Sequence, residues 1–399
     1  MAYYFIFPEL DTTLYSHPDR KTMNAGSDEL LEIVKEPGSS DQYHHPSRVL
    51  IKFKNDDILS AISLIGDSTF TSSLSSSVNL EIALADAKNI TETHIIAAYA
   101  VSQSWNEGTG KYLNLPTGSD GVSWTYKDNS TTATEWSGVT DVTDNFGGNG
   151  GTGSIFSSSG VNAPLTPGGG TWYTGSNFYG TQQFLKGEDL DINMDVKEIV
   201  HRWSASLNVG ETYPAGIDNY GFLLKTLDNV EANASSSFGE LQYFSSDTHT
   251  IYPPKLTFKW DDSVVYTDGT NNQNTAKSGS LFISLYNNQK EYNQNDEAIF
   301  RIHVRDKYPT RTFVTSSNYL NKGYFTTSSY YSIRDAHTER EIIPFDNTFT
   351  KLSADSEGMY FKMNMKGLQP ERYYRILLKH INKEGTIIYD DKYFFKVVR

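Results

Sequence analysis

Residues 78–84 read VNLEIAL, and every second residue of this stretch is large and apolar. A period of two places those side chains on one face of a β-strand and the residues between them on the other face. The same alternation recurs in RVLIKF at 48–53 and in FRIHVR at 300–305. The run IIAAYAV at 95–101 is apolar throughout, which predicts a central strand buried on both faces. Together these stretches predict an all-β protein.

Two short helices are expected among the strands. The apolar residues of the stretch 196–203 fall at positions i, i+3, i+4 and i+7, which gives one apolar helical stripe ending at Trp203. Asp195 followed by Glu198 resembles a capping box, so this helix is expected to begin just after Asp195. A second short helix is expected at 56–65. We expect Trp203 to have a structural role, as part of a helix that closes the end of a sandwich or barrel.

Charge divides the chain into two parts. Residues 281–399 contain 18 Lys and Arg against 14 Asp and Glu, a net charge of +4, whereas the rest of the chain carries −18. The polar stretch YTDGTNNQNTAKSGS at 266–280 coincides with this change of sign. We therefore expect a β-sandwich domain at 1–265, a linker at 266–280 and a smaller β-sandwich at 281–399.

Composition excludes several classes of function. The 399 residues include no cysteine, which rules out disulfide frameworks, CxxC motifs and thiol catalysis. A net charge of −14 argues against nucleic acid as the main partner. No apolar run approaches the ~18 residues of a membrane span. The start, MAYYFIFP, lacks the basic region of a targeting peptide, so synthesis in a cytoplasm is expected.

The segment 125–187 is rich in Gly, Ser, Thr and Asn and shows no strand pattern, so long ordered loops are expected there. Trp136, Trp172 and Tyr173 lie within this segment. Their rings are candidates for contact with a glycan or a partner protein, by stacking on sugar rings from exposed loops. The alternative is that they anchor the loops onto the sandwich.

Acidic residues provide two further hypotheses, neither with a specific motif. The run EDLDINMD at 188–195 invites a calcium interpretation, but an EF-hand starting at Asp189 needs glycine where Met194 stands. Helix entry is the favoured role for this run, because carboxylates stabilise a helix N-terminus. Glu107, Asp128 and Glu135 could form a glycosidase-like pair. No catalytic signature supports this, so we expect a non-enzyme without metal or other cofactor.

Several segments of residues 11–260 resemble, in order, the DNRLRE-type β-sandwich family, which is similar to carbohydrate-binding modules. The resemblance rests on the following pieces: DTTLY at 11–15, NAGSD at 24–28, RVLIKF at 48–53, SWNEG at 104–108, GVSW at 121–124, the helical 196–203, NYGFLL at 219–224, FSS at 244–246 and PPKL at 253–256. It implies a jelly-roll-like sandwich with long ordered loops. Similar domains occur in cell-surface proteins and in virion proteins of tailed phages.

A second resemblance covers the C-terminal part. GLQPERYY at 367–374 is similar to the fibronectin III and immunoglobulin-like motif in which Leu, Pro and Tyr precede the penultimate strand. It implies structural roles for Pro370 and Tyr374, with the tyrosine hydroxyl reaching back to the chain to fix a corner. The residues KYFFKVV at 392–398 are then the closing strand.

These two resemblances together imply a function. The combination looks like a non-enzymatic structural protein of a contractile-tailed, cyanophage-like phage, located at the tail periphery, baseplate or neck of the virion. Its expected partners are other virion structural proteins, with multiple copies in a symmetric assembly and with neither nucleic acid nor a membrane. The alternative is a module that binds a host surface polysaccharide.

Overall fold

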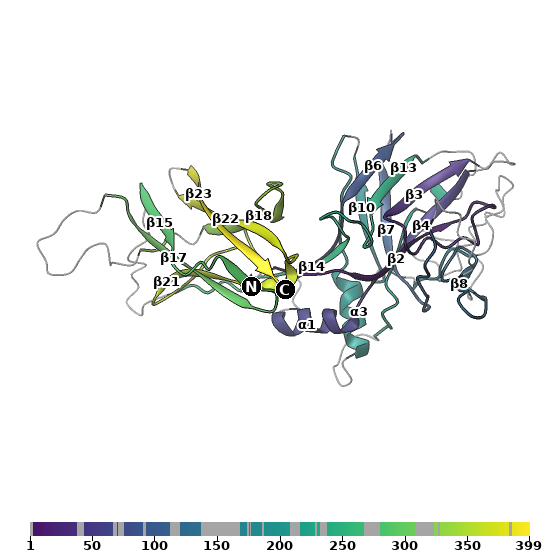
Figure 1. Ribbon diagram of the computed structural model, residues 1–399, viewed down its shortest axis with the longest axis horizontal. Coiled ribbons are helices and arrows are strands. Elements are labelled where there is room, and N and C mark those ends of the chain that lie inside the picture. Colours follow the sequence, from purple (N-terminus) through teal and green to yellow (C-terminus); the bar gives the residue numbers. More distant parts are fainter. Residues whose placement is uncertain are drawn as a thin grey trace, which may run out of the picture. The chain divides into compact units, whose positions relative to one another are not determined.

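The chain folds into curled, mainly antiparallel sheets that form β-sandwich-like units, which confirms the predicted all-β class (Figure 1). The computed structural model describes residues 3–37, 44–66, 70, 76–90, 93–111, 120–136, 168–173, 175, 177–185, 187–207, 216–227, 230–231, 238–266, 280–308, 323–325, 328–382 and 385–399. No helix among these residues is long and apolar enough to cross a membrane.

The chain divides into two compact units. We call Ile6–Leu64 with Val78–Thr257 the N-terminal unit, and Phe258–Arg399 with Met1–Phe5 and Ile65–Ser77 the C-terminal unit. Most of the expected linker, residues 267–279, lies outside the described part of the chain.

An eight-stranded sheet forms most of the N-terminal unit. Its order is β10-β7-β12-β4-β3-β13-β6, and β2 also pairs with β4. The strands are β2 (Pro8–Tyr15), β3 (Leu30–Pro37), β4 (His44–Phe53), β6 (Leu84–Lys88), β7 (His94–Ala100), β10 (Tyr179–Phe184), β12 (Phe222–Thr226) and β13 (Glu240–Phe244). A four-stranded sheet has the order β1-β14-β5-β11, with β1 (Tyr3–Ile6), β14 (Lys255–Trp260), β5 (Ser76–Ile82) and β11 (Ile192–Asp195). A small hairpin joins β8 (Tyr126–Asp128) to β9 (Thr134–Glu135).

The hydrophobic pattern accounts for the positions of these strands. In β5, buried and half-buried residues alternate along the whole strand, as the period of two predicts. Strand β7 pairs with β10 on one side and β12 on the other, and residues 96–100 are all buried. The uniformly apolar run is therefore a central strand, as predicted.

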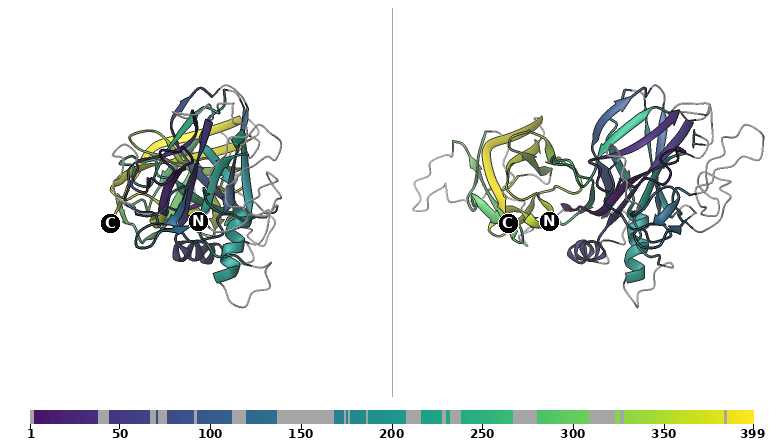
Figure 2. Two further views of the ribbon diagram at one scale, coloured as in Figure 1. Left: turned by 90° about the vertical axis from the view of Figure 1, so that its right-hand side faces the viewer. Right: turned by 45° about the vertical axis from the view of Figure 1, so that its right-hand side comes forward.

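Both expected helices are present, and they lie at the same end of the N-terminal unit (Figures 1 and 2). They are α1 (Asn55–Ile65) and α3 (Lys197–Leu207). Asp195 Oδ1 accepts a hydrogen bond from the Lys197 amide at 3.0 Å, which caps the start of α3. Trp203 is fully buried, with its ring centroid 4.6 Å from that of Phe222 in β12. Helix α3 is thus held against the sheet by its predicted apolar stripe.

Two sheets form the C-terminal unit. One has the order β15-β17-β21-β20, with β15 (Leu281–Leu285), β17 (Glu297–Asp306), β21 (Gly358–Asn364) and β20 (Ser353–Asp355). The other has the order β16-β23-β22-β18-β19, with β16 (Glu291–Asn293), β23 (Gly385–Val398), β22 (Arg372–Asn382), β18 (Ser329–Asp335) and β19 (Glu341–Ile343). Figure 2 shows β22 and β23 as a long curled hairpin in yellow. The two sheets make the C-terminal unit β-sandwich-like.

Tyr374 stands near the start of β22 with its ring buried in the core of the C-terminal unit. Its hydroxyl donates a hydrogen bond to the carbonyl oxygen of Gln369 at 2.8 Å, so it spans the turn that contains Pro370. The hydrogen bond ties the turn to the strand that follows. This is the geometry of a tyrosine corner.

The expectation that 125–187 contains no strand is wrong in its described part. Strands β8, β9 and β10 lie there, and β10 pairs with β7 along six residues. The sequence of β10, YGTQQF, is too polar to show a clear period, but an edge strand needs neither two buried faces nor two partners. The rest of this segment, 137–167, lies outside the described residues.

Candidate functional site

The structure corrects the expected exposure of two tryptophans. Trp136 and Trp172 are only 6% and 3% exposed and belong to one core cluster. The Trp136 Nε1–H donates to the carbonyl oxygen of Ser123 at 3.0 Å, and the Trp172 ring lies 5.7 Å from that of Tyr99. Burial of large aromatic surface stabilises the fold, so neither ring is available to stack on a sugar in this conformation.

Tyr173 differs from these two because it is half-buried and keeps exposed surface. Its ring stacks on Phe178 at a centroid distance of 5.5 Å, and its amide donates to the carbonyl oxygen of Ala100. Partial burial and the charge of Asp218 raise the pKa of its hydroxyl. Of the three predicted contact residues, Tyr173 is the one that remains accessible.

A buried ionic network lies beside Trp172, and no sequence motif indicates it. The Arg48 guanidinium carbon lies 4.6 Å from the Trp124 ring centroid and 5.2 Å from that of Trp172. Glu231 accepts hydrogen bonds from Arg48 Nε at 3.1 Å, from Arg48 Nη2 at 2.7 Å and from Lys225 Nζ at 2.9 Å. Burial alone would raise the pKa of Glu231, but the charges of Arg48 and Lys225 hold it below its usual value. All three side chains are fully buried, so the network fixes the fold and offers no reactive group to solvent.

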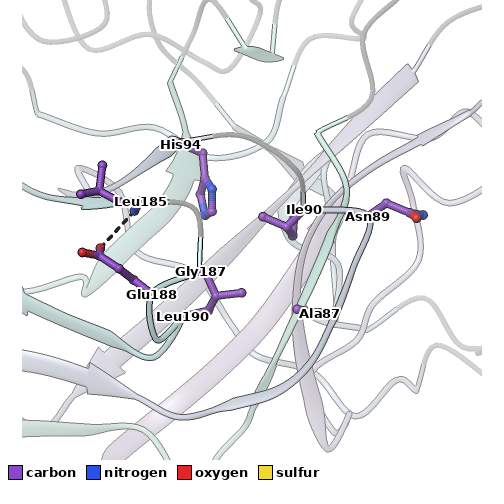
Figure 3. Close-up of a pocket in the computed structure, with 8 residues that line it drawn as sticks. All are labelled: Ala87, Asn89, Ile90, His94, Leu185, Gly187, Glu188 and Leu190. Carbon is purple, nitrogen blue, oxygen red and sulfur yellow. Dashed lines mark hydrogen bonds between the residues drawn. The ribbon is translucent and has the colours of Figure 1, made fainter.

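One surface pocket lies on the N-terminal unit at the β6–β7 and β10–β11 turns (Figure 3). Its volume is about 340 Å³, close to the lower end of the usual range for small-ligand sites. The residues that line it are Ala87, Asn89, Ile90, His94, Leu185, Gly187, Glu188 and Leu190. The pocket can therefore hold a ligand of about the size of one sugar unit.

The pocket lining combines apolar and polar groups. Leu185, Ile90 and Leu190 supply apolar surface, and Leu185 is 49% exposed. Glu188 Oε2 accepts a hydrogen bond from the Leu185 amide at 3.1 Å, which fixes the carboxylate at the pocket wall. The His94 ring stacks on Phe184 at 5.0 Å and is thereby held in place. Such a mixture suits a ligand with both C–H faces and hydroxyl groups.

A pair of carboxyl groups lies elsewhere in the N-terminal unit. Asp11, in β2, is 1% exposed, and its amide donates a hydrogen bond to Glu107 Oε1 at 2.6 Å. Asp11 Oδ2 accepts from the Ser246 amide at 2.7 Å, whereas Oδ1 is buried without a hydrogen-bond partner. A buried carboxylate oxygen without a donor is costly and rare in folded proteins.

The electrostatics of this pair are unusual. Burial is the main cause that raises the pKa of Asp11 to about 7, and the nearby charges of Glu107 and Asp247 raise it further. The pKa of Glu107 also rises to about 7, first from burial and then from the charges of Asp247 and Glu9. Both carboxyl groups therefore gain and lose a proton near neutral pH, and in their charged form a nearby cation would stabilise them.

The structure does not pair the three carboxylates suggested for glycosidic chemistry. Asp128 accepts hydrogen bonds from the amide and hydroxyl of Ser130, which lower its pKa. Glu135 is exposed in β9, where it lies opposite Tyr126. The carboxyl partner of Glu107 is Asp11. Both residues belong to segments of the family resemblance (SWNEG and DTTLY), but they are 96 positions apart and nothing in the sequence paired them.

The acidic run at 188–195 serves the local fold. Asp189 accepts from the Asp191 amide, Asp191 from the Leu84 amide at 2.7 Å, and Asp195 caps α3. In the described part of the chain, no three His, Cys, Asp or Glu side chains form a ready-made metal centre.

Comparison with known proteins gives no relative to guide the interpretation of these sites. No protein-family model, no curated protein and no solved structure matches the chain.

Proposed function

We propose that the protein is a non-enzymatic structural component of a tailed-phage virion, at the tail periphery, baseplate or neck. In this proposal the C-terminal unit docks onto a neighbouring virion subunit, and several copies occupy equivalent places in a symmetric assembly. The resemblance of the two sandwich domains to phage structural proteins supports the setting, and surface chemistry supports the docking role.

The distribution of exposed apolar side chains carries the proposal. Of twelve large hydrophobic side chains that are exposed among the described residues, ten belong to the C-terminal unit. They are Val264, Val265, Tyr266, Phe282, Tyr286, Ile299, Tyr308, Tyr373, Ile388 and Phe394. Exposed apolar side chains that gather on one face are typical of protein–protein contact sites.

Three of these residues belong to one sheet face, which we call the β15–β17 face. Phe282 and Tyr286 alternate with Ile283 and Leu285, which are buried in the core, and Ile299 points outward from β17 in the same sense. Basic groups interleave with them on this face. The Arg305 guanidinium carbon lies 4.2 Å from the Phe282 ring centroid, and Phe282 is directly opposite Arg305 in the sheet.

Arg301 and Arg305 alternate along β17 with buried Ile302 and Val304 and so share the outward side of the strand. Aromatic and arginine side chains are enriched at protein interfaces, where they supply large contact area and charge-assisted hydrogen bonds. Arg301 is already paired with Asp355 at 2.7 Å and with Glu357 at 3.4 Å, so this face fits a protein surface with apolar groups and a carboxylate placed to meet Arg305. A second virion subunit of that character is the expected occupant.

The test is incorporation into particles assembled without the protein. Purified wild-type chain should bind such particles at saturable stoichiometry, and the double variant Phe282→Ser/Ile299→Ser should bind at least ~10-fold more weakly, because hot-spot residues contribute ~2 kcal/mol or more. The control is Leu185→Ser, which removes an exposed leucine from the N-terminal unit. Equal loss in the control, or no loss in the double variant, contradicts the docking role of this face.

The second candidate function is binding of a host glycan, and the 340 Å³ pocket favours it. A glycan array should then show binding that Leu185→Ser and Glu188→Gln reduce and that Glu240→Gln, a half-buried surface variant outside the pocket, preserves. Alanine variants of Trp136 or Trp172 are unsuitable for this purpose because both rings are core residues. Absence of binding by the wild-type chain removes this candidate.

A further inference from the structure

Segments far apart in the sequence meet at the Asp11–Glu107 pair. Besides the two hydrogen bonds that link Asp11 to Glu107 and to Ser246, the Ser245 hydroxyl donates to the carbonyl oxygen of Asp28 at 2.6 Å. Asp247 follows directly and is exposed at the rim. The cluster therefore extends from the fully buried carboxyl of Asp11 to the exposed carboxyl of Asp247.

The loop that carries Glu107 is held rigidly. The Asn24 side-chain amide donates to the carbonyl oxygens of Glu107 and of Val122, and its Oδ1 accepts from the amides of Gly26 and Gly110. A Cβ atom at Gly26 would lie 2.3 Å from the Glu107 carbonyl oxygen, so only glycine permits this close approach. Glu107 is thus fixed beside Asp11 before any ligand arrives.

The charges that face this position are mostly negative. Asp11, Glu107, Asp247 and Glu9 interact electrostatically there, and Lys52 lies 3.5 Å from Glu9 at the outer side. Asp11 Oδ1 is left without a hydrogen-bond donor although the residue is 1% exposed. Rigid loops that bring anionic oxygens together, one of them without a hydrogen-bond donor, have the chemistry that suits a cation.

We propose that the Asp11–Glu107 cluster binds one calcium ion, with Asp11 Oδ1 and the Glu107 carboxylate as its anionic ligands. Calcium is the fitting cation because every donor is a hard oxygen, and because its shell of about six to eight oxygens accepts main-chain carbonyls and water beside carboxylates. These additional ligands are required, since no three acidic or histidine side chains in the described residues form a complete set. The ion joins β2 to the loops at Glu107 and Ser246 and stabilises the N-terminal unit, independently of docking by the C-terminal unit.

The experiment is calcium binding to the full-length chain at pH 7.5 after removal of metals with a chelator. Isothermal titration should give one calcium ion per chain, and magnesium should bind more weakly. At free calcium ~100-fold above Kd, the unfolding midpoint of the N-terminal unit should rise by ~5–10 °C. Asp11→Asn and Glu107→Gln should each weaken calcium binding by at least ~10-fold.

A control variant and a second cluster variant separate calcium binding from effects on folding. Asp128→Asn, which changes a half-buried carboxylate outside the cluster, should bind calcium like the wild type. Glu107→Gln serves if Asp11→Asn does not fold, because Glu107 is only half-buried. No calcium binding by the wild type at pH 7.5 overturns the proposal and leaves a proton as the partner of the two carboxyls. Equal binding by wild type and by both cluster variants overturns it as well.

Discussion

Replacing Glu231 by glutamine should destabilise the N-terminal unit more than any surface charge change. The substitution keeps the size of the side chain but removes its charge. Arg48 and Lys225 would then contact a neutral amide in place of the carboxylate, at a site where neither side chain has any exposed surface. The cost of the change is therefore set by the loss of the negative charge that both buried cations contact.

The magnitude follows from the three hydrogen bonds that Glu231 accepts, all from charged donors at 2.7–3.1 Å. Hydrogen bonds to charged groups contribute roughly 1.5–3 kcal/mol each, but they are not additive in one network. Breaking a buried ion pair by removing one partner costs about 3–5 kcal/mol. We expect a loss of that size, which lowers the unfolding midpoint by ~10 °C in a unit of this length.

Tryptophan fluorescence during urea unfolding is the assay, because five of the six tryptophans belong to the N-terminal unit. Glu240→Gln is the control: Glu240 pairs with Lys88 at 3.2 Å at a partly exposed site, and such pairs contribute less than about 1 kcal/mol. Replacing Arg48, Lys225 and Glu231 together by apolar residues of similar size should recover much of the loss. A loss under ~1 kcal/mol for Glu231→Gln would refute the view that this network fixes the fold.

Three further predictions concern single positions. Tyr374→Phe should cost the C-terminal unit about 1 kcal/mol in urea unfolding by loss of the bond to Gln369, whereas exposed Tyr373→Phe should cost nothing measurable. Gly168→Ala should lower the free energy of unfolding several-fold more than Gly187→Ala. Both glycines have a positive φ, but a Cβ atom at Gly168 would lie 2.0 Å from the Trp124 carbonyl oxygen, whereas a Cβ atom at Gly187 would meet open space. Burial lowers the pKa of His380, so the folded state resists protonation of this side chain and the unfolding free energy should fall as the pH drops below ~6.5. The variant His380→Gln should flatten that part of the pH profile of the unfolding free energy. An unchanged slope would contradict the assignment to His380.

The sequence predicted the fold where periodicity was strong and local. The alternation at 78–84, the apolar run at 95–101 and the helical stripe ending at Trp203 all appear as expected. The sequence does not predict strand β10 because an edge strand can be polar. Pairing with β7, rather than a hydrophobic pattern of its own, makes this segment a strand. A hydrophobic period in the sequence therefore predicts core strands, but it does not predict polar strands at the edge of a sheet.

The candidate sites were harder to predict, because they depend on long-range contacts. Arg48 meets Glu231 across 183 residues, and Asp11 meets Glu107 across 96. No local spacing of residues in the sequence predicts such long-range contacts. Trp136 and Trp172 lie in a Gly-rich segment that suggested exposure, yet both rings are part of the core. Glu107 was identified as a chemically interesting carboxylate from the sequence, but its partner was not.

Quantitative mass spectrometry of purified particles of the tailed phage to which we propose to assign the chain tests the proposed function most directly. The account predicts that the protein is present at a fixed copy number relative to the other tail proteins, and that chemical cross-links to neighbouring subunits arise mainly from lysines of the C-terminal unit. Absence of the protein from purified particles would contradict the account.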